Sequence, residues 1–185
     1  MLKDVYKEAE TRMKGAIQAL EDDLGGIRTG RASPALIERL QVEYYGAPTP
    51  LIQLATISVP EPRSLLIRPF DASSLKEIER AIQASDLGLT PNNDGKAIRL
   101  NLPPLTEERR IELTRVVHNR SEEARVAVRN VRRDSIRDLR EFMHEKMISE
   151  DDLKRGEEEL QKITDRYIDE INTVGDRKEK EILEV

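Results

Sequence analysis

Apolar residues recur at steps of three and four along three highly charged stretches of the chain, which is the spacing of one face of an α-helix. Over the first 27 residues this face consists of Leu2, Tyr6, Ala9, Met13, Ala16, Leu20, Leu24 and Ile27. In the stretch 107–147 it consists of Leu113, Val117, Ala124, Val128, Val131, Leu139 and Phe142. In the stretch 149–185 it consists of Leu153, Leu160, Ile163, Tyr167, Ile171, Val174 and Ile182. Because each face is narrow and needs partners, we predict an elongated, antiparallel three-helix bundle.

The middle of the chain differs from these stretches in composition and in its hydrophobic pattern. All nine prolines lie between Pro34 and Pro104, and only 16 of the 77 residues in 30–106 are charged. Alternation at Leu40, Val42 and Tyr44 predicts a strand that leads into a turn over 45–48. We therefore expect a separate, sheet-containing domain within this range.

Further elements of this middle region can be placed by pattern. Residues 54–59 and 64–68 predict two short strands, and residues 73–84 predict an amphipathic helix capped by Asp71 or Ser73. Asn93-Asp94-Gly95 is a hairpin signal before a strand over 96–102. The predicted class is α+β: a small β/α/β domain over 30–106 is inserted into a helical bundle formed by 1–29 and 107–185.

Two segments join the predicted domains, 27–34 and 103–106. Gly30 has backbone freedom that other residues lack, while Pro34, Pro103 and Pro104 prevent a helix from continuing. One interpretation is that these residues only end helices. The other is a two-stranded hinge between rigid bodies, made of Thr29, Gly30, Arg31, Pro103, Pro104, Leu105 and Thr106.

Local signals also mark where the last two helices begin. Thr106, followed by Glu107 and Glu108, places carboxylates near a positive helix N-terminus. Ser149, followed by Asp152, resembles a capping box, although Asp stands where Glu is preferred.

Residues 125–140, RVAVRNVRRDSIRDLR, contain six arginines, no lysine and two acidic residues, although the whole chain has a formal net charge of −5. On a helical projection Arg125, Arg129 and Arg132 lie within about 60° of one another, and the basic surface is extended to the far side by Arg133, Arg137 and Arg140. By contrast, residues 149–185 contain thirteen acidic and seven basic residues. Charge is therefore strongly polarised along the chain.

A run of charges is usually a solvated face whose members pair at i,i+4. Here we expect Glu122 to reach Arg125 but not the later arginines, so the stripe lacks partners. Guanidinium groups match phosphate in a bidentate manner, which favours nucleic acid over an acidic protein surface as the partner. Without interleaved aromatic residues, base stacking is not expected, and recognition would use the backbone and shape of structured RNA.

Several functional classes find little support. The chain has no Cys, which excludes disulfides and thiolate metal sites, and its two histidines are expected to be surface residues. No phosphate loop, nucleophile elbow or metal spacing is present, so neither an enzyme nor a cofactor is expected. The charged N-terminal residues and the absence of long apolar runs predict a cytoplasmic protein without membrane spans. An oligomeric coiled-coil scaffold remains an alternative, although three apolar faces in one chain favour a monomer.

Four segments, IRTGRASPAL (27–36), VEYYGAPTPL (42–51), PPLTEERR (103–110) and VAVRNVRRD (126–134), resemble the ribosome recycling factor family, in order and with matching spacing. The resemblance spans the whole chain and implies an L-shaped molecule. It further implies a function with elongation factor G and GTP, splitting the ribosome after termination to free the mRNA. The resemblance places ribosomal RNA contacts of the large subunit at Arg28, Arg129 and Arg132, with Arg31 and Arg133 as neighbours; the helical projection adds Arg125.

Overall fold

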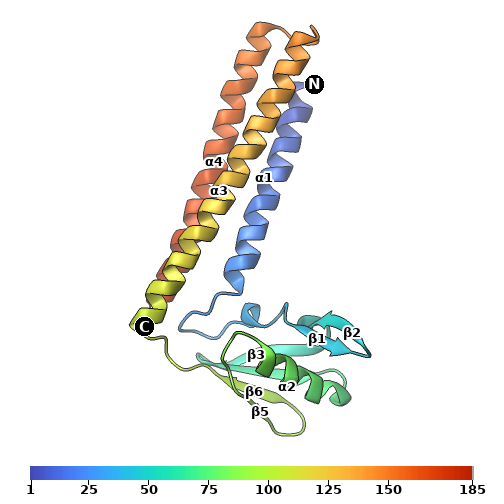
Figure 1. The fold of residues 1–185 in the computed structure, drawn as a ribbon, viewed down its shortest axis with the longest axis vertical. Coiled ribbons are helices and arrows are strands. Elements are labelled where there is room, and N and C mark those ends of the chain that lie inside the picture. The colour runs from blue at the N-terminus through green and yellow to red at the C-terminus, as the bar shows by residue number, and fades with distance from the viewer. Residues whose placement is uncertain (185) are drawn as a thin grey trace. The chain divides into compact units, whose positions relative to one another are not determined.

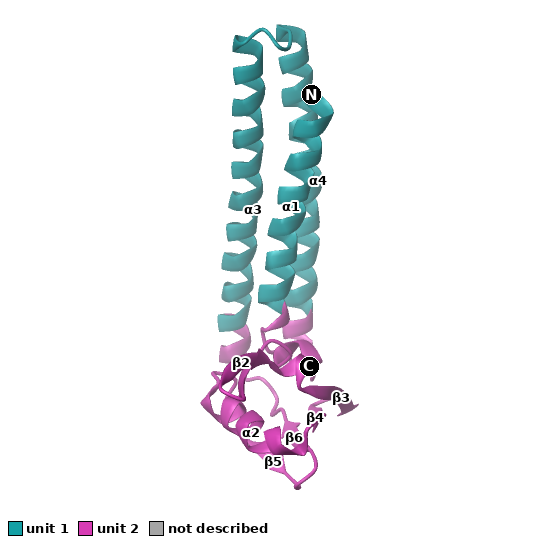
Figure 2. Cartoon of the chain, turned by 90° about the vertical axis from the view of Figure 1, so that its right-hand side faces the viewer, with its two compact units in different colours: residues 1–24, 112–180 teal, residues 25–111, 181–185 magenta. Residues whose placement is uncertain are grey.

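The computed structural model describes residues 1–184 and divides into two compact units (Figure 2). The first unit comprises Met1–Leu24 and Glu112–Lys180, and the second comprises Gly25–Ile111 together with residues 181–184. The first unit is a bundle of helices and the second carries the sheets. The predicted α+β class, with a sheet domain inserted into a three-helix bundle, is confirmed.

Three long helices lie side by side: α1 (Leu2–Gly25), α3 (Glu107–His144) and α4 (Glu150–Leu183) (Figure 1). α3 runs antiparallel to the other two. Their buried positions repeat the predicted spacing, and on α3 they are Leu113, Val117, Ser121, Ala124, Val128, Val131, Ser135 and Leu139. Burial of this stripe against the neighbouring helices supplies the apolar core that an isolated helix of this composition lacks.

Helix ends differ from the prediction in two places. α1 ends at Gly25, so Ile27 lies outside the helix that was expected to include it. Two successive glycines follow Leu24, and each costs a helix interior about 1 kcal/mol relative to Ala, which favours an early end. α3 ends at His144 rather than near residue 147, and Lys146 adopts a positive φ of 60° in the turn that follows.

α3 and α4 approach each other closely at two glycines. A Cβ atom built on Gly156 would lie 2.6 Å from Cδ1 of Leu139, and one built on Gly175 would lie 2.7 Å from Oγ of Ser121. Carbon atoms at van der Waals contact are about 3.5–4.0 Å apart, so no side chain fits at either position without displacement. Glycine therefore sets the distance between these two helices.

The capping box at the start of α4 is confirmed. The backbone N–H of Ser149 donates to Oδ2 of Asp152 at 3.1 Å, and the backbone N–H of Asp152 donates to Oγ of Ser149 at 3.0 Å. These bonds lower the pKa of Asp152, the backbone bond from Ser149 having the largest effect and the Arg155 charge a smaller one. Thr106 caps α3 in a similar way, with its Oγ1 accepting from the N–H of Arg109 at 3.1 Å.

Replacing Ser149 with Ala is expected to lower the free energy of unfolding at neutral pH by about 1 kcal/mol, because a helix donor loses its acceptor. Asp152→Ala is expected to destabilise the protein at neutral pH as well. The folded pKa of Asp152 lies below its ordinary value of 3.8. Its contribution is therefore complete above that value and is lost as the pH falls through the lower, folded pKa.

Thermal denaturation of wild type and Asp152→Ala across this pH range is the measurement. The two melting temperatures should converge in strong acid. Asp151→Ala, which removes the adjacent exposed carboxylate, is the matched control and should show a smaller difference at neutral pH. A difference in melting temperature between wild type and Asp152→Ala that grows as the pH falls would contradict the capping role.

The second unit contains two antiparallel sheets. A hairpin pairs β1 (Gln41–Tyr44) with β2 (Ala47–Pro50). The larger sheet has the order β3-β4-β6-β5, formed by β3 (Ala55–Glu61), β4 (Ser64–Pro69), β5 (Pro91–Asn93) and β6 (Ile98–Asn101). The strands predicted over 54–59 and 64–68 correspond to β3 and β4, and the predicted Asn93-Asp94-Gly95 hairpin joins β5 to β6.

The turn predicted over 45–48 is shorter in the structure. Only Tyr45 and Gly46 form it, with positive φ angles of 50° and 78°, and Ala47 already belongs to β2. Positive φ at both central residues is the type I′ pattern, which matches the twist of a two-residue hairpin. The chain therefore forms two strands here, β1 and β2, where the alternation predicted one.

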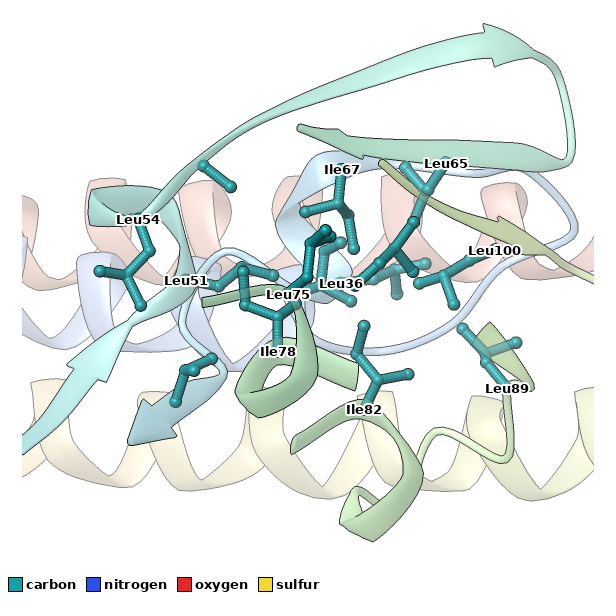
Figure 3. Close-up of a cluster of buried hydrophobic side chains, with 14 of the residues drawn as sticks. Leu36, Leu51, Leu54, Leu65, Ile67, Leu75, Ile78, Ile82, Leu89 and Leu100 are labelled. Carbon is teal, nitrogen blue, oxygen red and sulfur yellow. The ribbon is translucent and has the colours of Figure 1, made fainter. Parts of the chain in front are cut away.

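One hydrophobic core fills this unit. α2 (Leu75–Ala84) buries Leu75, Ile78 and Ile82, and β4 and β6 contribute Leu65, Ile67, Ile98 and Leu100 to the same core (Figure 3). A short 3₁₀ turn, Ala72–Ser74, precedes α2, and Asp71 caps this turn by accepting from the N–H of Ser73 at 3.0 Å. α2 therefore begins two residues later than predicted.

Candidate nucleic-acid interface

The arginines predicted to bind RNA flank the buried stripe of α3. Ala124, Val128 and Val131 point into the core, and each is followed by an arginine of the stripe. One residue of α-helix is a rotation of about 100°, so Arg125, Arg129 and Arg132 lie half-exposed beside the core. Arg133 is fully on the outer surface. These four residues are called the arginine face below.

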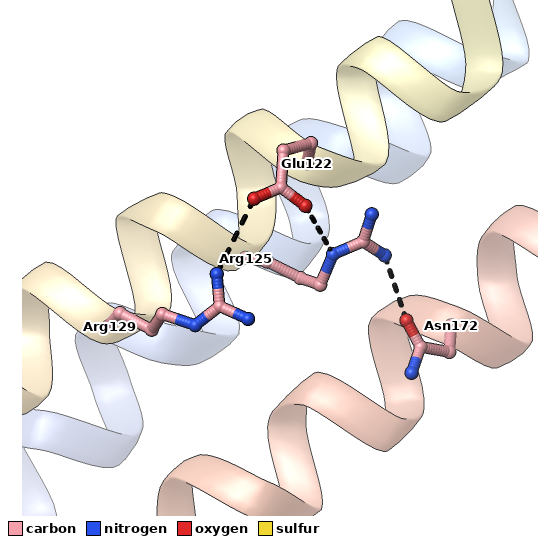
Figure 4. A network of polar contacts seen from close by, with 4 residues as sticks. All are labelled: Glu122, Arg125, Arg129 and Asn172. Carbon is pink, nitrogen blue, oxygen red and sulfur yellow. Dashed lines mark hydrogen bonds and ion pairs between the residues drawn. The ribbon is translucent and has the colours of Figure 1, made fainter. Parts of the chain in front are cut away.

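Glu122 contacts two members of the arginine face at once (Figure 4). Its Oε2 accepts from Nε of Arg125 at 2.8 Å, and its Oε1 lies 3.4 Å from Nη1 of Arg129. The hydrogen bond from Arg125 is the main cause that lowers the pKa of Glu122, so the carboxylate is ionised at neutral pH. The expectation that Glu122 would not reach beyond Arg125 is therefore wrong. Two long side chains span the two helical turns that separate residues 122 and 129.

α4 meets the arginine face with amides rather than carboxylates. Nη1 of Arg125 donates to Oδ1 of Asn172 at 2.8 Å, and Arg132 donates to the amide oxygen of Gln161. Gln161 in turn donates to Asp165 at 2.8 Å. An amide oxygen satisfies a guanidinium donor and fixes its direction without cancelling its charge. The acidic composition of α4 therefore does not neutralise these arginines.

The nearby carboxylates Asp134 and Glu157 pair instead with arginines outside the arginine face. Nε of Arg140 lies 3.4 Å from Glu157 of α4, and Arg12 of α1 lies 3.0 Å from Asp134, which also contacts Arg137 at 3.4 Å. The basic surface that the sequence indicated up to residue 140 is therefore largely paired at its far end. The unbalanced charge is concentrated between residues 125 and 133.

Among residues 1–184, the recorded ion pairs of the four guanidinium groups in the arginine face are to one carboxylate, that of Glu122. Within residues 1–184, no ion pair is recorded for Arg132 or Arg133. Nε of Arg132 is buried without a hydrogen-bond partner. A cation without an ionic partner near the protein surface is stabilised by a counterion or a bound anion. The arginine face is therefore suited to binding phosphate groups.

Arg28 and Arg31 belong to the second unit. Arg28 donates to the carbonyl oxygen of Pro103, so it ties together the two joining segments, and its Nε is buried without a partner. Burial, and to a smaller degree the charge of Arg109, lowers the pKa of Arg28. Arg31 is exposed, and no side-chain contact of Arg31 is recorded among residues 1–184. The structure thus gives Arg28 a supporting contact and leaves Arg31 accessible.

The predicted hinge residues are mostly free of regular secondary structure. Thr29 is buried, and its Oγ1 accepts from the N–H of Arg31 at 3.3 Å and donates to the Arg31 carbonyl at 3.1 Å. A Cβ on Gly30 would lie 3.4 Å from the carbonyl oxygen of Glu184. Pro103, Pro104 and Thr106 are exposed, while Leu105 is buried.

The described residues offer no group of three or more His, Asp or Glu side chains that could hold a metal ion. His118 is exposed, with its Nε2 at 3.0 Å from Glu179 of α4. No helix within residues 1–184 is long and apolar enough to cross a membrane.

Sequence reasoning missed Asn172 and Gln161 as partners of the arginine face. Both lie on α4, and which residue of α4 faces Arg125 depends on the axial alignment of two helices. That alignment follows from the close contacts at Gly156 and Gly175, which periodicity alone does not reveal. Glu122 was identified, but its contact with Arg129 was not.

Comparisons with known proteins agree with one another. The ribosome recycling factor family model matches residues 20–183. Ribosome-recycling factors of Roseiflexus castenholzii and Halalkalibacterium halodurans are each 57% identical to the chain over 185 residues, with full coverage of both sequences. A solution structure of ribosome recycling factor is 50% identical and has a TM-score of 0.79, covering 100% of this chain and 98% of that one.

A second structural neighbour is the T. thermophilus ribosome recycling factor, described with E. coli elongation factor G bound to the E. coli post-termination complex. It is 49% identical, with a TM-score of 0.70 and complete coverage of both chains. The family model spans most of the chain, and the relatives match it from end to end. The chain belongs to the ribosome recycling factor family.

Proposed function

We propose that the chain acts in the cytoplasm with elongation factor G and GTP to split the post-termination ribosome, releasing it from mRNA for another round of translation. Membership of the family supports the activity, and the neighbour described with elongation factor G on a post-termination complex supports the partners. The chain itself supplies binding and movement, and the GTP chemistry belongs to elongation factor G.

The arginine face is the proposed contact with ribosomal RNA of the large subunit, with Arg28 and Arg31 as additional contacts. The observation that supports it is the excess of guanidinium groups over carboxylates between residues 125 and 133, where α4 contributes Asn172 and Gln161 rather than acids. Recognition through phosphates requires no base stacking, and residues 122–140 contain no aromatic residue.

Binding of purified large ribosomal subunits across a salt series tests this contact. If about four phosphates are neutralised, log affinity should fall with log salt at a slope near −3, since each contact contributes roughly 0.7–0.9. Co-sedimentation of the monomeric protein measures the bound fraction. Affinity that does not change with salt would exclude phosphate contacts as the main source of binding.

We also propose that the joining segments, Thr29–Arg31 and Pro103–Thr106, form a hinge. Movement of the second unit about this hinge displaces an RNA contact between the two ribosomal subunits. The chain has no native Cys, so one cysteine can be introduced into each unit and the pair linked with a bifunctional reagent. The linked protein should bind large subunits normally and fail to split ribosomes. Each single-cysteine variant is the control, and normal splitting by the linked protein would contradict the hinge.

An oligomeric scaffold is the alternative function. The apolar faces of α1, α3 and α4 are buried within one chain, so residues 1–184 present no long apolar stripe to a second copy. Analytical ultracentrifugation distinguishes the two, because a stable dimer at micromolar concentration would favour the scaffold.

A further inference from the structure

Glu122 occupies the position between Arg125 and Arg129 where an anion would bind. We propose that Glu122 is an internal competitor for the RNA phosphate, which holds the arginine face in the free protein and is displaced when the phosphate arrives. This inference rests on the proposed contact with ribosomal RNA. The other residues assigned to this surface raise its affinity for RNA, whereas Glu122 lowers it.

The geometry of Glu122 resembles that of a bound phosphate. Its two carboxylate oxygens contact different guanidinium groups, Arg125 at 2.8 Å and Arg129 at 3.4 Å. Phosphate and carboxylate present the same kind of charged oxygen acceptor to arginine, and both accept paired N–H groups. A phosphate that binds the same N–H groups of both arginines therefore takes the place of this carboxylate (Figure 4).

The carboxylate of Glu122 is held loosely enough to leave. Its side chain is 55% exposed and that of Arg129 is 41% exposed, so both are largely hydrated. Ion pairs in such surroundings change an equilibrium only a few-fold, and the Glu122 side chain has free solvent around it to enter. Displacement by a highly charged RNA is therefore feasible.

Arg125 keeps its orientation when Glu122 leaves. Its Nη1 donates to Oδ1 of Asn172 at 2.8 Å, and its side chain is only 22% exposed. The uncharged amide thus acts as the permanent support and Glu122 as the exchangeable partner. This division explains why one guanidinium group is contacted by both a carboxylate and an amide.

The consequence is weaker binding than the arginine face alone would give. A phosphate that uses these N–H groups of Arg125 and Arg129 first breaks their contacts with Glu122, and the freed carboxylate then repels the RNA. A factor that acts repeatedly must leave the ribosome after each cycle, so a limit on affinity serves turnover.

Glu122→Gln tests the competitor directly. It keeps the size of the side chain, removes the charge and replaces one acceptor oxygen with an NH₂ donor, so the side chain can no longer accept from both arginines. We expect large-subunit binding about two- to five-fold tighter than wild type at a fixed salt concentration, the range expected for an exposed ion pair. The salt slope should stay close to that of wild type, because both proteins make the same phosphate contacts once Glu122 has been displaced.

Glu123→Gln is the matched control. Glu123 is the adjacent residue, its side chain is 65% exposed, and it pairs with Arg120 at 3.2 Å. Arg120 lies about 180° around the helix from Arg129, on the opposite side of α3. The control removes the same charge without freeing the arginine face, and thermal denaturation of both variants confirms that they fold.

Tighter binding by Glu122→Gln, together with a smaller change for Glu123→Gln, supports the competitor. An equal change in affinity for the two variants would mean that loss of any nearby negative charge has this effect. That result would overturn the inference. Weaker binding by Glu122→Gln would also overturn it, since Glu122 would then orient the arginines rather than compete. In either case salt-dependent binding by the wild type would leave the RNA contact itself intact, whereas its absence would refute that contact.

Discussion

Replacing Arg132 with Ala is expected to weaken binding to large ribosomal subunits by about 1–3 kcal/mol, the loss typical of a hydrogen bond to a charged group. Arg132 donates to Gln161 and has no carboxylate partner recorded within residues 1–184, so its full charge is available for phosphate. The salt slope should become shallower by roughly 1, because one phosphate contact is removed. Co-sedimentation across a salt series measures both quantities.

Two further variants separate charge from geometry. Arg120→Ala removes the same charge from a position about 120° around α3 from Arg132. Arg120 pairs there with Glu123, so this variant should change affinity little. Arg132→Lys keeps the charge but loses the planar fork of donors, so an intermediate affinity is expected. Wild-type affinity for Arg132→Ala would refute the assignment of the arginine face.

The largest expected effect on stability is at Gly156. A valine there would place its Cβ 2.6 Å from Cδ1 of Leu139, whose side chain is fully buried. The side chains packed between α3 and α4 would therefore have to move. Overpacking of this kind costs about 1–3 kcal/mol. For a domain of this size, each kcal/mol lowers the melting temperature by about 2–4 °C.

Gly15 provides the matched control for this substitution. It lies within α1, and a Cβ built on it would meet nothing within 4 Å. Gly15→Val should be neutral or slightly stabilising, because valine has a higher helix propensity than glycine. Equal destabilisation by both substitutions, measured by thermal denaturation, would show that crowding at Leu139 is not the cause.

The three helices were predictable because their stabilising contacts repeat every three or four residues. Val117, Val128 and Leu139, all predicted as core positions of α3, are buried. The end of α1 was placed too late, since periodicity extends to Ile27 while the glycines before it end the helix. Strand pairing in the second unit was not predictable in the same way, because β4 pairs with β6 across the 28 intervening residues 70–97.

The arginine face was predictable only in part. Its position on α3 follows from the repeat, but the partners of its arginines depend on which residues of α4 face them. Asn172 and Gln161 could have been distinguished from acids such as Asp165 only by knowing the alignment of α3 and α4. The reach of Glu122 to Arg129 was missed because the usual rule covers side chains three or four residues apart.

The two glycine contacts of α4 also limit which motions the helical unit allows. A shift of α4 along α3 by one turn, about 5.4 Å, would bring Asp152 or Leu160 to the position of Gly156, and Ile171 or Glu179 to that of Gly175. Neither Leu139 nor Ser121 leaves room for such side chains. Sliding between these helices is therefore blocked at two points, and a force applied to one end of the pair is transmitted to the other without slippage.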